Sequence, residues 1–382
     1  MIKYTPKLQN SNTSIFATMS ALSNECGAIN LGQGFPNFDC SDQLKEIIKH
    51  YLDSGKNQYC PMPGLLDLRE VLAQKIEKLY NRAIDPQSEI TVTAGATQAI
   101  FTAISAFINN GDEAIIFEPA YDCYKPSIEI AGGATRPIKL TGPDYKINWT
   151  EVEETINAKT KMIILNTPHN PIGKIMSDDD MRKLSAILKG SNILLLSDEV
   201  YEHLVFDDQE HQSALKYPDL HDKTIAVYSF GKTFHSTGWK MGYCVAPKNL
   251  MDGFRNIHQW NVFSVNSFLQ YALADYLKEE EHYLGLHQFY QDKRDFFNNK
   301  MLDSKLKVIP AEGTYFQLLD YSAVSDKKDL EFANWMCKNH GVASIPLSPF
   351  YGSGSNEKVV RLCFAKTEDV LEKAASKLTA IN

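Results

Sequence analysis

The sequence predicts an α/β protein, with a large domain built on a mainly parallel sheet between helices and a smaller α+β domain built from the chain ends. Short runs of β-branched and apolar residues alternate with helical stretches from about residue 90 onwards. This order is typical of a parallel sheet covered by helices. Several of the runs are apolar at successive positions, which indicates strands that are buried on both faces.

The individual elements follow the chain in order. A β-branched run predicts a strand over 90–93, and the small and apolar residues after it predict a helix over 96–108. Similar runs predict further strands over 113–117, 162–165, 193–196, 224–228 and 242–246. A long helix is expected from 267 to 281.

The character of the chain changes after this helix. Charged helical stretches at 281–302 and 329–339 lie among short strand candidates at 313–318 and 359–364, which predicts a smaller α+β domain. We therefore expect an N-terminal arm with part of the small domain over 1–44, a large domain over 45–280, and the rest of the small domain over 281–382.

The composition excludes several classes of protein. The chain has 382 residues, of which 43% are hydrophobic and 23% charged, so disordered and fibrous classes are excluded. Its net charge is −8 and no basic stripe is present, so nucleic acid is not an expected partner. No apolar run approaches the ~20 residues of a membrane helix, and the N-terminus lacks the apolar core of a secretion signal.

The seven cysteines are scattered, and none has the spacing of a zinc site. We expect no metal and a cytoplasmic location, because an odd number of unpaired thiols fits a reducing compartment.

Candidate site residues follow the ends of the predicted strands, where ligands bind in doubly wound sheets. The turn with Gly95, Ala96 and Thr97 opens a helix, and free amides there favour an anion. An ordinary helix cap that includes Thr97 is the alternative. Tyr121 follows the next strand, where an aromatic ring stacks on a flat ligand or packs in the core. Asn170 lies in a rigid polar loop between prolines, and its alternative role is to cap a turn.

Asp198 ends a buried strand, where an isolated carboxylate is costly. It therefore needs a cation, and a protonated pyridine nitrogen and a distant arginine both remain open. Lys232 lies among small and apolar residues, and desolvation favours its neutral, nucleophilic amine, which can form a Schiff base. A surface lysine is the alternative. Arg361 lies in an apolar strand and needs a planar anion, either a substrate carboxylate or a structural partner.

Taken together, these motifs resemble the class I aminotransferases of the fold-type I pyridoxal-phosphate enzymes, and the resemblance spans essentially the whole chain. It rests on the segments 30–36, 57–64, 93–97, 166–173, 197–201 and 229–233. Within the family the chain is similar to the branch of methionine aminotransferases and kynurenine/glutamine aminotransferases. The segments 197–203 and 342–348 also look like the methionine enzymes.

The resemblance implies the residues that bind pyridoxal 5'-phosphate. Lys232 would hold the cofactor through a Schiff base and move protons, Asp198 would pair with the ring nitrogen, and Tyr121 would stack on the ring. Tyr201 and Asn170 would bond the phenolate oxygen of the ring.

For the phosphate, the resemblance implies a set of short polar groups and amides, namely Ser229, Lys240, Gly95, Ala96 and Thr97. Lys240 stands where aspartate aminotransferases have an arginine, so its grip on the phosphate is less directional. The family also implies a homodimer in which Tyr59 of the partner subunit reaches the phosphate. The substrate would contact Arg361, Gly34, Asn170, Phe16 and Tyr121.

The expected function is transfer of the α-amino group of a neutral amino acid to a 2-oxo acid by a ping-pong mechanism. Methionine is the favoured donor, with aromatic residues, glutamine or kynurenine as further donors. The segments expected to line the pocket contain apolar and aromatic residues and no arginine for a second carboxylate: 15–16, 34–35, Phe263, Tyr315 and 345–350.

Two other functions remain open. A C–S β-lyase would use the same lysine and aspartate, and a non-enzymatic effector domain of a transcription regulator would use the same fold. Nucleotide motifs fit less well. Ala226 stands where a P-loop needs its first glycine, and Asn37 stands where a dinucleotide fingerprint needs its third.

Overall fold

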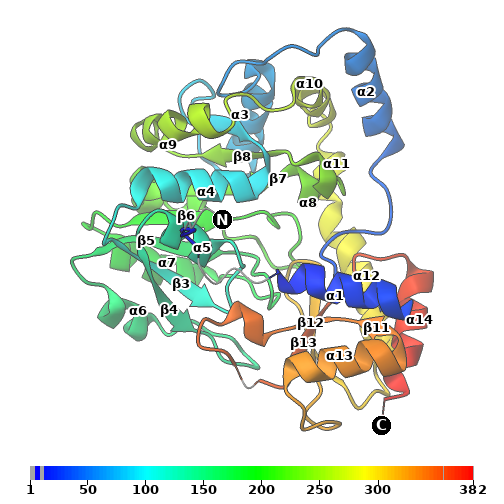
Figure 1. Cartoon of the computed structure of the whole chain (residues 1–382). Coiled ribbons are helices and arrows are strands. Elements are labelled where there is room, and N and C mark those ends of the chain that lie inside the picture. The colour runs from blue at the N-terminus through cyan, green and yellow to red at the C-terminus, as the bar shows by residue number, and fades with distance from the viewer. Residues whose placement is uncertain (1–4, 9–12, 356, 382) are drawn as a thin grey trace.

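A seven-stranded sheet forms the centre of the large domain (Figure 1), with the strand order β2-β8-β7-β6-β5-β3-β4. The computed structural model describes residues 5–8, 13–355 and 357–381. Strand β8 runs antiparallel to both of its neighbours, and the other neighbouring strands run parallel. The predicted mainly parallel sheet is therefore confirmed. Its strands are β2 (Ile90–Thr93), β3 (Glu113–Glu118), β4 (Ala134–Lys139), β5 (Thr160–Asn166), β6 (Leu194–Asp198), β7 (Thr224–Ser229) and β8 (Gly242–Val245).

Helices cover both faces of this sheet. Successive side chains of a strand point to opposite faces, and here both sets are apolar, so both faces must be buried. In β3, Ile116 packs in one apolar cluster and Ile115 in the other. The first cluster includes side chains of α4 (Gly95–Phe107), α5 (Tyr124–Ile130) and α9 (Lys248–Asn261). The second includes side chains of α3 (Leu66–Tyr80), α6 (Trp149–Thr155), α7 (Asp178–Leu188) and α10 (Ser267–Tyr276).

The two ends of the chain meet in a smaller α+β region. Strand β1 (Ile29–Asn30) pairs with β11 (Val342–Ala343), and Figure 1 shows α1 (Ile15–Cys26) in blue beside the orange and red helices. A second sheet has the order β12-β13-β10-β9 and is antiparallel. Its strands are β9 (Lys307–Ile309), β10 (Phe316–Asp320), β12 (Ile345–Pro346) and β13 (Val359–Cys363). The helices of this region are α12 (Leu286–Lys300), α13 (Asp329–His340) and α14 (Glu368–Thr379). The short helix α11 (Glu281–Leu284) precedes them and packs on the large region, where Tyr283 lies beside Lys75 and His203.

The segment between α1 and α3 connects the two regions. Helix α2 (Asp42–Asp53) packs on α10 of the large region, where Tyr51 and Tyr271 stack with 5.4 Å between their ring centroids. This packing agrees with a change of region near residue 44, although the boundaries at 44 and 280 stay predictions.

Three predicted elements differ from the structure, and one strand was not predicted. The helix expected over 267–281 ends at Tyr276, and the helix expected over 281–302 is divided at Gly285 into α11 and α12. Strand β10 begins only at Phe316 because the preceding Thr314 has a φ of 67°, which does not fit a strand. Strand β4 was not predicted, since it lies at the sheet edge with mostly exposed residues.

Among the described residues, no helix is both long and apolar enough to cross a membrane. All seven cysteines are free thiols.

The fold gathers polar strand ends at one edge of the central sheet. Strands β5 and β6 end side by side at Asn166 and Asp198, which are register partners. Because β8 is antiparallel, its first residue lies at the same edge, beside the start of α4. A Cβ atom on Gly242 would lie 2.6 Å from the carbonyl oxygen of Tyr228 and 3.1 Å from the amide nitrogen of Ala96. Glycine thus allows β8 to pass close to the N-terminus of α4.

We expect Gly242→Ala to destabilise the protein by about 1–3 kcal/mol, because the added methyl group would collide with backbone atoms that cannot move independently. Thermal unfolding of the purified variant measures the effect as a lower melting temperature. Gly238→Ala is the matched control, since a Cβ at Gly238 would meet no atom within 4 Å. Equal melting temperatures for the two variants would contradict the close approach of β8 to α4.

Candidate active site

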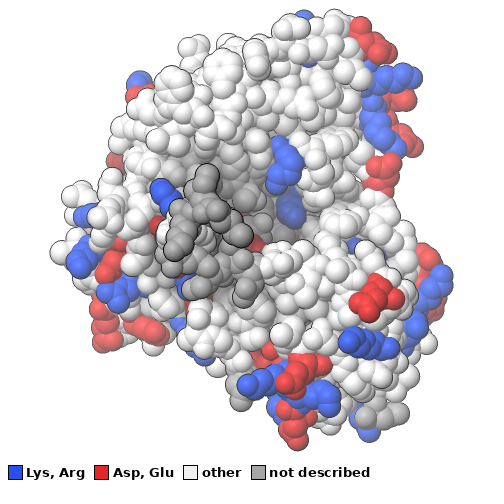
Figure 2. Space-filling view, viewed as in Figure 1, with Lys and Arg blue, Asp and Glu red and all other residues white. Residues whose placement is uncertain are grey.

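A cavity of about 260 Å³ lies at this edge of the sheet. Its walls come from strand ends of the large region and from α1, β10 and β13 of the smaller one. On the face shown in Figure 2, the surface is hollowed near its centre and Lys or Arg atoms lie in the hollow. The cavity therefore lies where two separately built parts of the chain meet.

Lys232 projects into this cavity from α8 (Phe230–Thr233), the short helix that directly follows β7. Its Nζ donates to the hydroxyl of Tyr315 at 2.9 Å and to the carbonyl of Gly34 at 3.3 Å. Burial lowers the pKa of the Lys232 amine to about 8, and the nearby Arg361 adds to this effect. The alternative of an ordinary surface lysine is wrong.

Asp198 is 3% exposed at the end of β6. Its Oδ2 accepts a hydrogen bond from the hydroxyl of Tyr124 at 2.6 Å. Burial raises the pKa of the Asp198 carboxyl to about 6, against a smaller opposing effect of the Tyr124 hydrogen bond. No Lys or Arg of the described residues forms a salt bridge with it, so the alternative of a distant structural arginine is not found.

Sequence reasoning missed two residues that hold Asp198. Tyr124 is one. Asn166 is the other, because its Nδ2 donates to the carbonyl of Asp198 at 2.9 Å and its Oδ1 accepts from the amide of Asn170 at 2.7 Å. A polar residue that ends the buried strand β5 was the available signal for Asn166. No local signal identifies Tyr124, since it meets Asp198 only through the tertiary fold.

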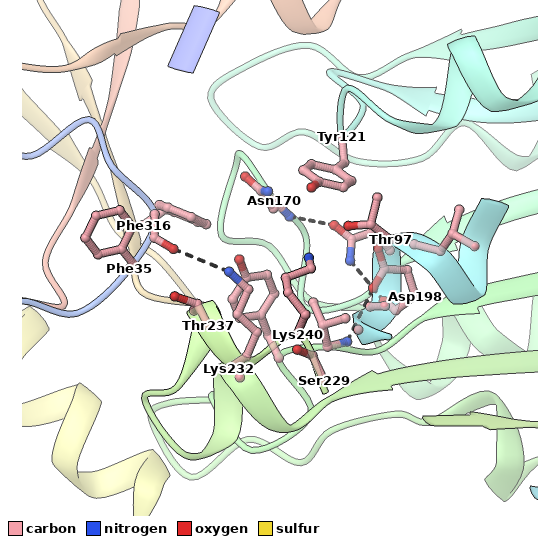
Figure 3. A pocket seen from close by; sticks show the side chains of 18 of the residues that line it. Phe35, Thr97, Tyr121, Asn170, Asp198, Ser229, Lys232, Thr237, Lys240 and Phe316 are labelled. Atoms are coloured by element: carbon pink, nitrogen blue, oxygen red, sulfur yellow. Dashed lines mark hydrogen bonds between the residues drawn. The ribbon is translucent and has the colours of Figure 1, made fainter. Parts of the chain in front are cut away.

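The phosphate end of the cavity has the character of an anion site. Gly95 begins α4 with a φ of 76°, and a Cβ there would lie 3.4 Å from Nζ of Lys240. The side chains of Thr97, Ser229 and Lys240 line the same cavity and surround it in Figure 3. A helix N-terminus with hydroxyl groups and an ammonium beside it favours a phosphate group.

Arg361 is 0% exposed in β13. Its two terminal nitrogens donate to Oδ1 of Asn170 at 2.8 Å and to the carbonyl of Gly32 at 3.0 Å, while its buried Nε has no partner. Its guanidinium carbon lies 3.9 Å from the ring centroid of Phe316. Burial lowers the pKa of Arg361 to about 10. No carboxylate of the described residues pairs with it, so the alternative of a structural salt bridge is not found and the group remains open to an external anion.

Most of the residues that the sequence predicted for the site line this single cavity: Phe16, Gly34, Gly95, Ala96, Thr97, Tyr121, Asn170, Asp198, Tyr201, Ser229, Lys232, Lys240 and Arg361. The carbonyl of Gly32, in the same loop as Gly34, accepts a hydrogen bond from Arg361. Asn170 uses its side-chain oxygen for Arg361, which leaves its Nδ2 for a ligand. In Figure 3, Tyr121 lies above the cavity, Asp198 lies at its right, and Lys232 and Lys240 enter it from below.

Several predicted residues do not line the cavity of their own chain, namely Tyr59, Phe263, Ile15, Tyr315 and those at 345–350. Tyr59 is 81% exposed and packs against Phe263 with 5.4 Å between the ring centroids. Neither residue lines the cavity formed by this chain.

The cavity fits pyridoxal phosphate. The buried carboxylate of Asp198 has no cation of the described residues beside it, and a protonated ring nitrogen would supply one. The backbone at Gly95 with Lys240 fits the phosphate, and the amine of Lys232 fits the aldehyde. The donor set thus matches the three reactive parts of the cofactor.

Comparisons with known proteins agree with this set. The family model "Aminotransferase class I and II" matches residues 27–378. A methionine aminotransferase of Escherichia coli is 48% identical over 97% of each chain, and a kynurenine–oxoglutarate transaminase of Dictyostelium discoideum is 34% identical over 98% of this chain and 96% of its own.

Solved structures show the same likeness. The E. coli protein YbdL, a methionine aminotransferase, superposes with a TM-score of 0.98 at 47% identity, over 99% of this chain and 100% of that one. A Thermus thermophilus aspartate aminotransferase superposes with a TM-score of 0.91 at 26% identity over the full length of both chains.

We expect the cofactor-free Asp198→Asn variant to be more stable than the wild type above about pH 6. The folded-state pKa of about 6 exceeds the ordinary value of 3.8, so the folded wild type loses stability as pH rises through this window. The shift corresponds to about 3 kcal/mol. Denaturant unfolding at a series of pH values measures it, and the difference should vanish below about pH 4. A variant that is less stable than wild type at neutral pH would contradict the unpaired state of Asp198.

Proposed function

The chain belongs to the class I and II aminotransferase family, and we propose that this pyridoxal-phosphate-dependent aminotransferase takes its amino group from methionine and similar neutral amino acids. The observation that carries the proposal is the charge of the cavity wall. Its cationic residues are Lys232, Lys240 and Arg361. If Lys232 serves the chemistry and Lys240 the phosphate, Arg361 is left to bind a single carboxylate.

The remaining wall favours an apolar side chain. Phe16, Phe35 and Phe316 line the cavity, and Phe350 packs on Phe16 with 5.7 Å between the ring centroids. A thioether or aromatic side chain gains from burial against these rings. A second carboxylate in the same place would be buried without a cation, which is costly. The two most similar relatives reported above act on methionine and on kynurenine by name, which supports the same choice.

Pyridoxal phosphate, when bound, supplies an aldehyde that takes the amino group and a ring that withdraws electrons from the substrate α-carbon. We propose that Asp198 keeps the proton on the ring nitrogen, since its charge is costly without that partner. Tyr201 and the free Nδ2 of Asn170 would bond the ring oxygen, and Tyr121 would cover the ring face.

The phosphate would be held by hydroxyl groups, an ammonium and amides, namely those of Ser229, Thr97, Lys240, Gly95 and Ala96. Arg361 would orient the substrate by its carboxylate, since both of its terminal nitrogens are already fixed and the guanidinium is planar.

Lys232 would both hold the cofactor and move the proton at the substrate α-carbon. Its lowered pKa of about 8 means that a substantial fraction of the free amine is neutral near physiological pH, which is the form that accepts a proton. A 2-oxo acid would then receive the amino group in the second half of a ping-pong cycle.

We also propose a homodimer and a cytoplasmic location. Exposed aromatic side chains support the dimer, because Tyr59, Phe263 and the 83% exposed Trp260 lie outside their own chain's cavity. In the dimer, Tyr59 of the partner subunit would reach the phosphate. The seven free thiols support a reducing compartment.

We expect Lys232→Ala to lose the visible absorption of the covalently held cofactor and at least about 10²-fold in kcat, because both attachment and proton transfer depend on this amine. Borohydride treatment followed by peptide mass spectrometry should fix the cofactor to Lys232 in the wild type alone. Lys248→Ala is the control, since Lys248 is an exposed lysine paired with Asp252. Fixation of the cofactor in Lys232→Ala would contradict the assignment.

We expect kcat/KM to be at least about 10²-fold higher for methionine than for aspartate, because aspartate would bury an unpaired carboxylate. Phenylalanine, glutamine and kynurenine complete the panel, with 2-oxo acid consumption as the readout. Faster turnover of aspartate would refute the proposed donor. Release of a 2-oxo acid from cystathionine without any acceptor would instead identify the β-lyase.

A further inference from the structure

Tyr315 connects the amine of Lys232 with the loop that contains Gly34. It lies directly before β10 and is 0% exposed. Its hydroxyl accepts a hydrogen bond from Nζ of Lys232 at 2.9 Å and donates one to the carbonyl of Gly34 at 2.7 Å. The same amine also reaches the Gly34 carbonyl, at 3.3 Å. The three groups therefore form a closed triangle of hydrogen bonds.

The direction of these bonds follows from the chemistry of each group. A carbonyl only accepts, and the Gly34 carbonyl at 2.7 Å is the nearest partner of the phenol oxygen, so the single proton of the phenol is assigned to Gly34. The phenol oxygen then presents only lone pairs to Lys232, and the amine must donate an N–H to it. Burial raises the pKa of the Tyr315 phenol well above its usual value, so Tyr315 keeps this proton and remains a fixed acceptor.

We propose that Tyr315 is a positioning residue for Lys232, which holds one N–H of the freed amine and thereby aims its lone pair away from the wall and towards the substrate. The proton-transfer part of this inference rests on the proposed function, and the effect on the amine itself does not. The Gly34 carbonyl extends the arrangement to the loop 31–36. In this loop the Gly32 carbonyl holds Arg361 at 3.0 Å, so the base and the carboxylate-binding residue share one support.

Other charged and titratable groups also act on Lys232. Arg361 and Lys240 disfavour its ammonium form, whereas Asp198 and Cys363 favour it, and burial outweighs all of them. The ring of Tyr201 lies 5.6 Å from Nζ. Against this background an acceptor at 2.9 Å stabilises the ammonium. Removal of the Tyr315 hydroxyl should therefore lower the pKa of Lys232 further, by about one pH unit.

The matched control is Tyr290→Phe. Tyr290 is also 0% exposed, and its ring centroid lies 5.7 Å from that of Tyr315. Its buried hydroxyl has no partner among the described residues. Tyr290→Phe and Tyr315→Phe thus each remove one buried phenol oxygen from neighbouring rings, but only the second removes a contact with Lys232.

The first experiment uses the full-length chain freed of cofactor. A small amine-acetylating reagent is applied between about pH 6 and about pH 10, and acetylation of Lys232 is followed by peptide mass spectrometry. We expect the labelling midpoint to move down by about one pH unit in Tyr315→Phe and to stay at the wild-type value in Tyr290→Phe. Equal midpoints in Tyr315→Phe and wild type would overturn the proposal.

The second experiment uses the cofactor-loaded enzyme and methionine deuterated at the α-carbon. If Tyr315 aims the base, Tyr315→Phe should lower kcat about 10-fold or more with little change in KM and should increase the isotope effect. A rise in KM alone, with the isotope effect unchanged, would show a purely structural role and overturn the proposal. A chain that binds no cofactor would refute the proposed function, while the acetylation midpoints would still decide whether Tyr315 acts on Lys232.

Discussion

The buried carboxylate of Asp198 is the constraint on which the rest of the site depends. It ends the strand β6 inside the protein with a tyrosine hydroxyl and no cation of the described residues beside it. The charge of such a group lowers the stability of the fold until a cation arrives from outside. In the cofactor-free state this charge lowers the stability of the fold above about pH 6, and a cationic ligand would remove that cost. Tyr124 bonds the carboxylate and Asn166 bonds the backbone carbonyl of Asp198, so the carboxylate has a defined position.

The site also requires that the large region and the smaller region are held in a fixed position relative to each other. Asn170 lies in the loop after β5 of the central sheet, and Arg361 lies in β13 of the second sheet. The two side chains nevertheless form a hydrogen bond of 2.8 Å. Lys232 makes a comparable connection, from α8 to Gly34 and Tyr315. The positions of the Arg361 guanidinium and of the Lys232 amine therefore both depend on how these regions fit together.

The sequence predicted the parts of the structure that have a local cause. Continuous apolar runs predicted the buried strands, for example β7, and the polar residues after them predicted the edge where the cavity lies. Strand β4 was not predicted, because it is an exposed edge strand that contains Pro137. The contact of Tyr124 with Asp198 and the hydrogen bonds around Tyr315 were not predicted for a different reason. These contacts join residues far apart in the chain, such as positions 232 and 315, and only the tertiary fold brings them together.

The antiparallel direction of β8 has a consequence for how this segment can change. Because the chain reverses between β7 and β8, one short stretch provides Ser229, Lys232 and Lys240 before it re-enters the sheet at Gly242. A residue inserted within this stretch would displace all three of these cavity-lining side chains together, since both ends are held in the sheet. Buried positions restrict the stretch as well, since Phe230 and Phe234 are almost fully buried and a Cβ on Gly231 would lie 2.9 Å from Cα of Thr237. The segment is therefore limited in length by its two ends in the sheet and in composition by its buried positions.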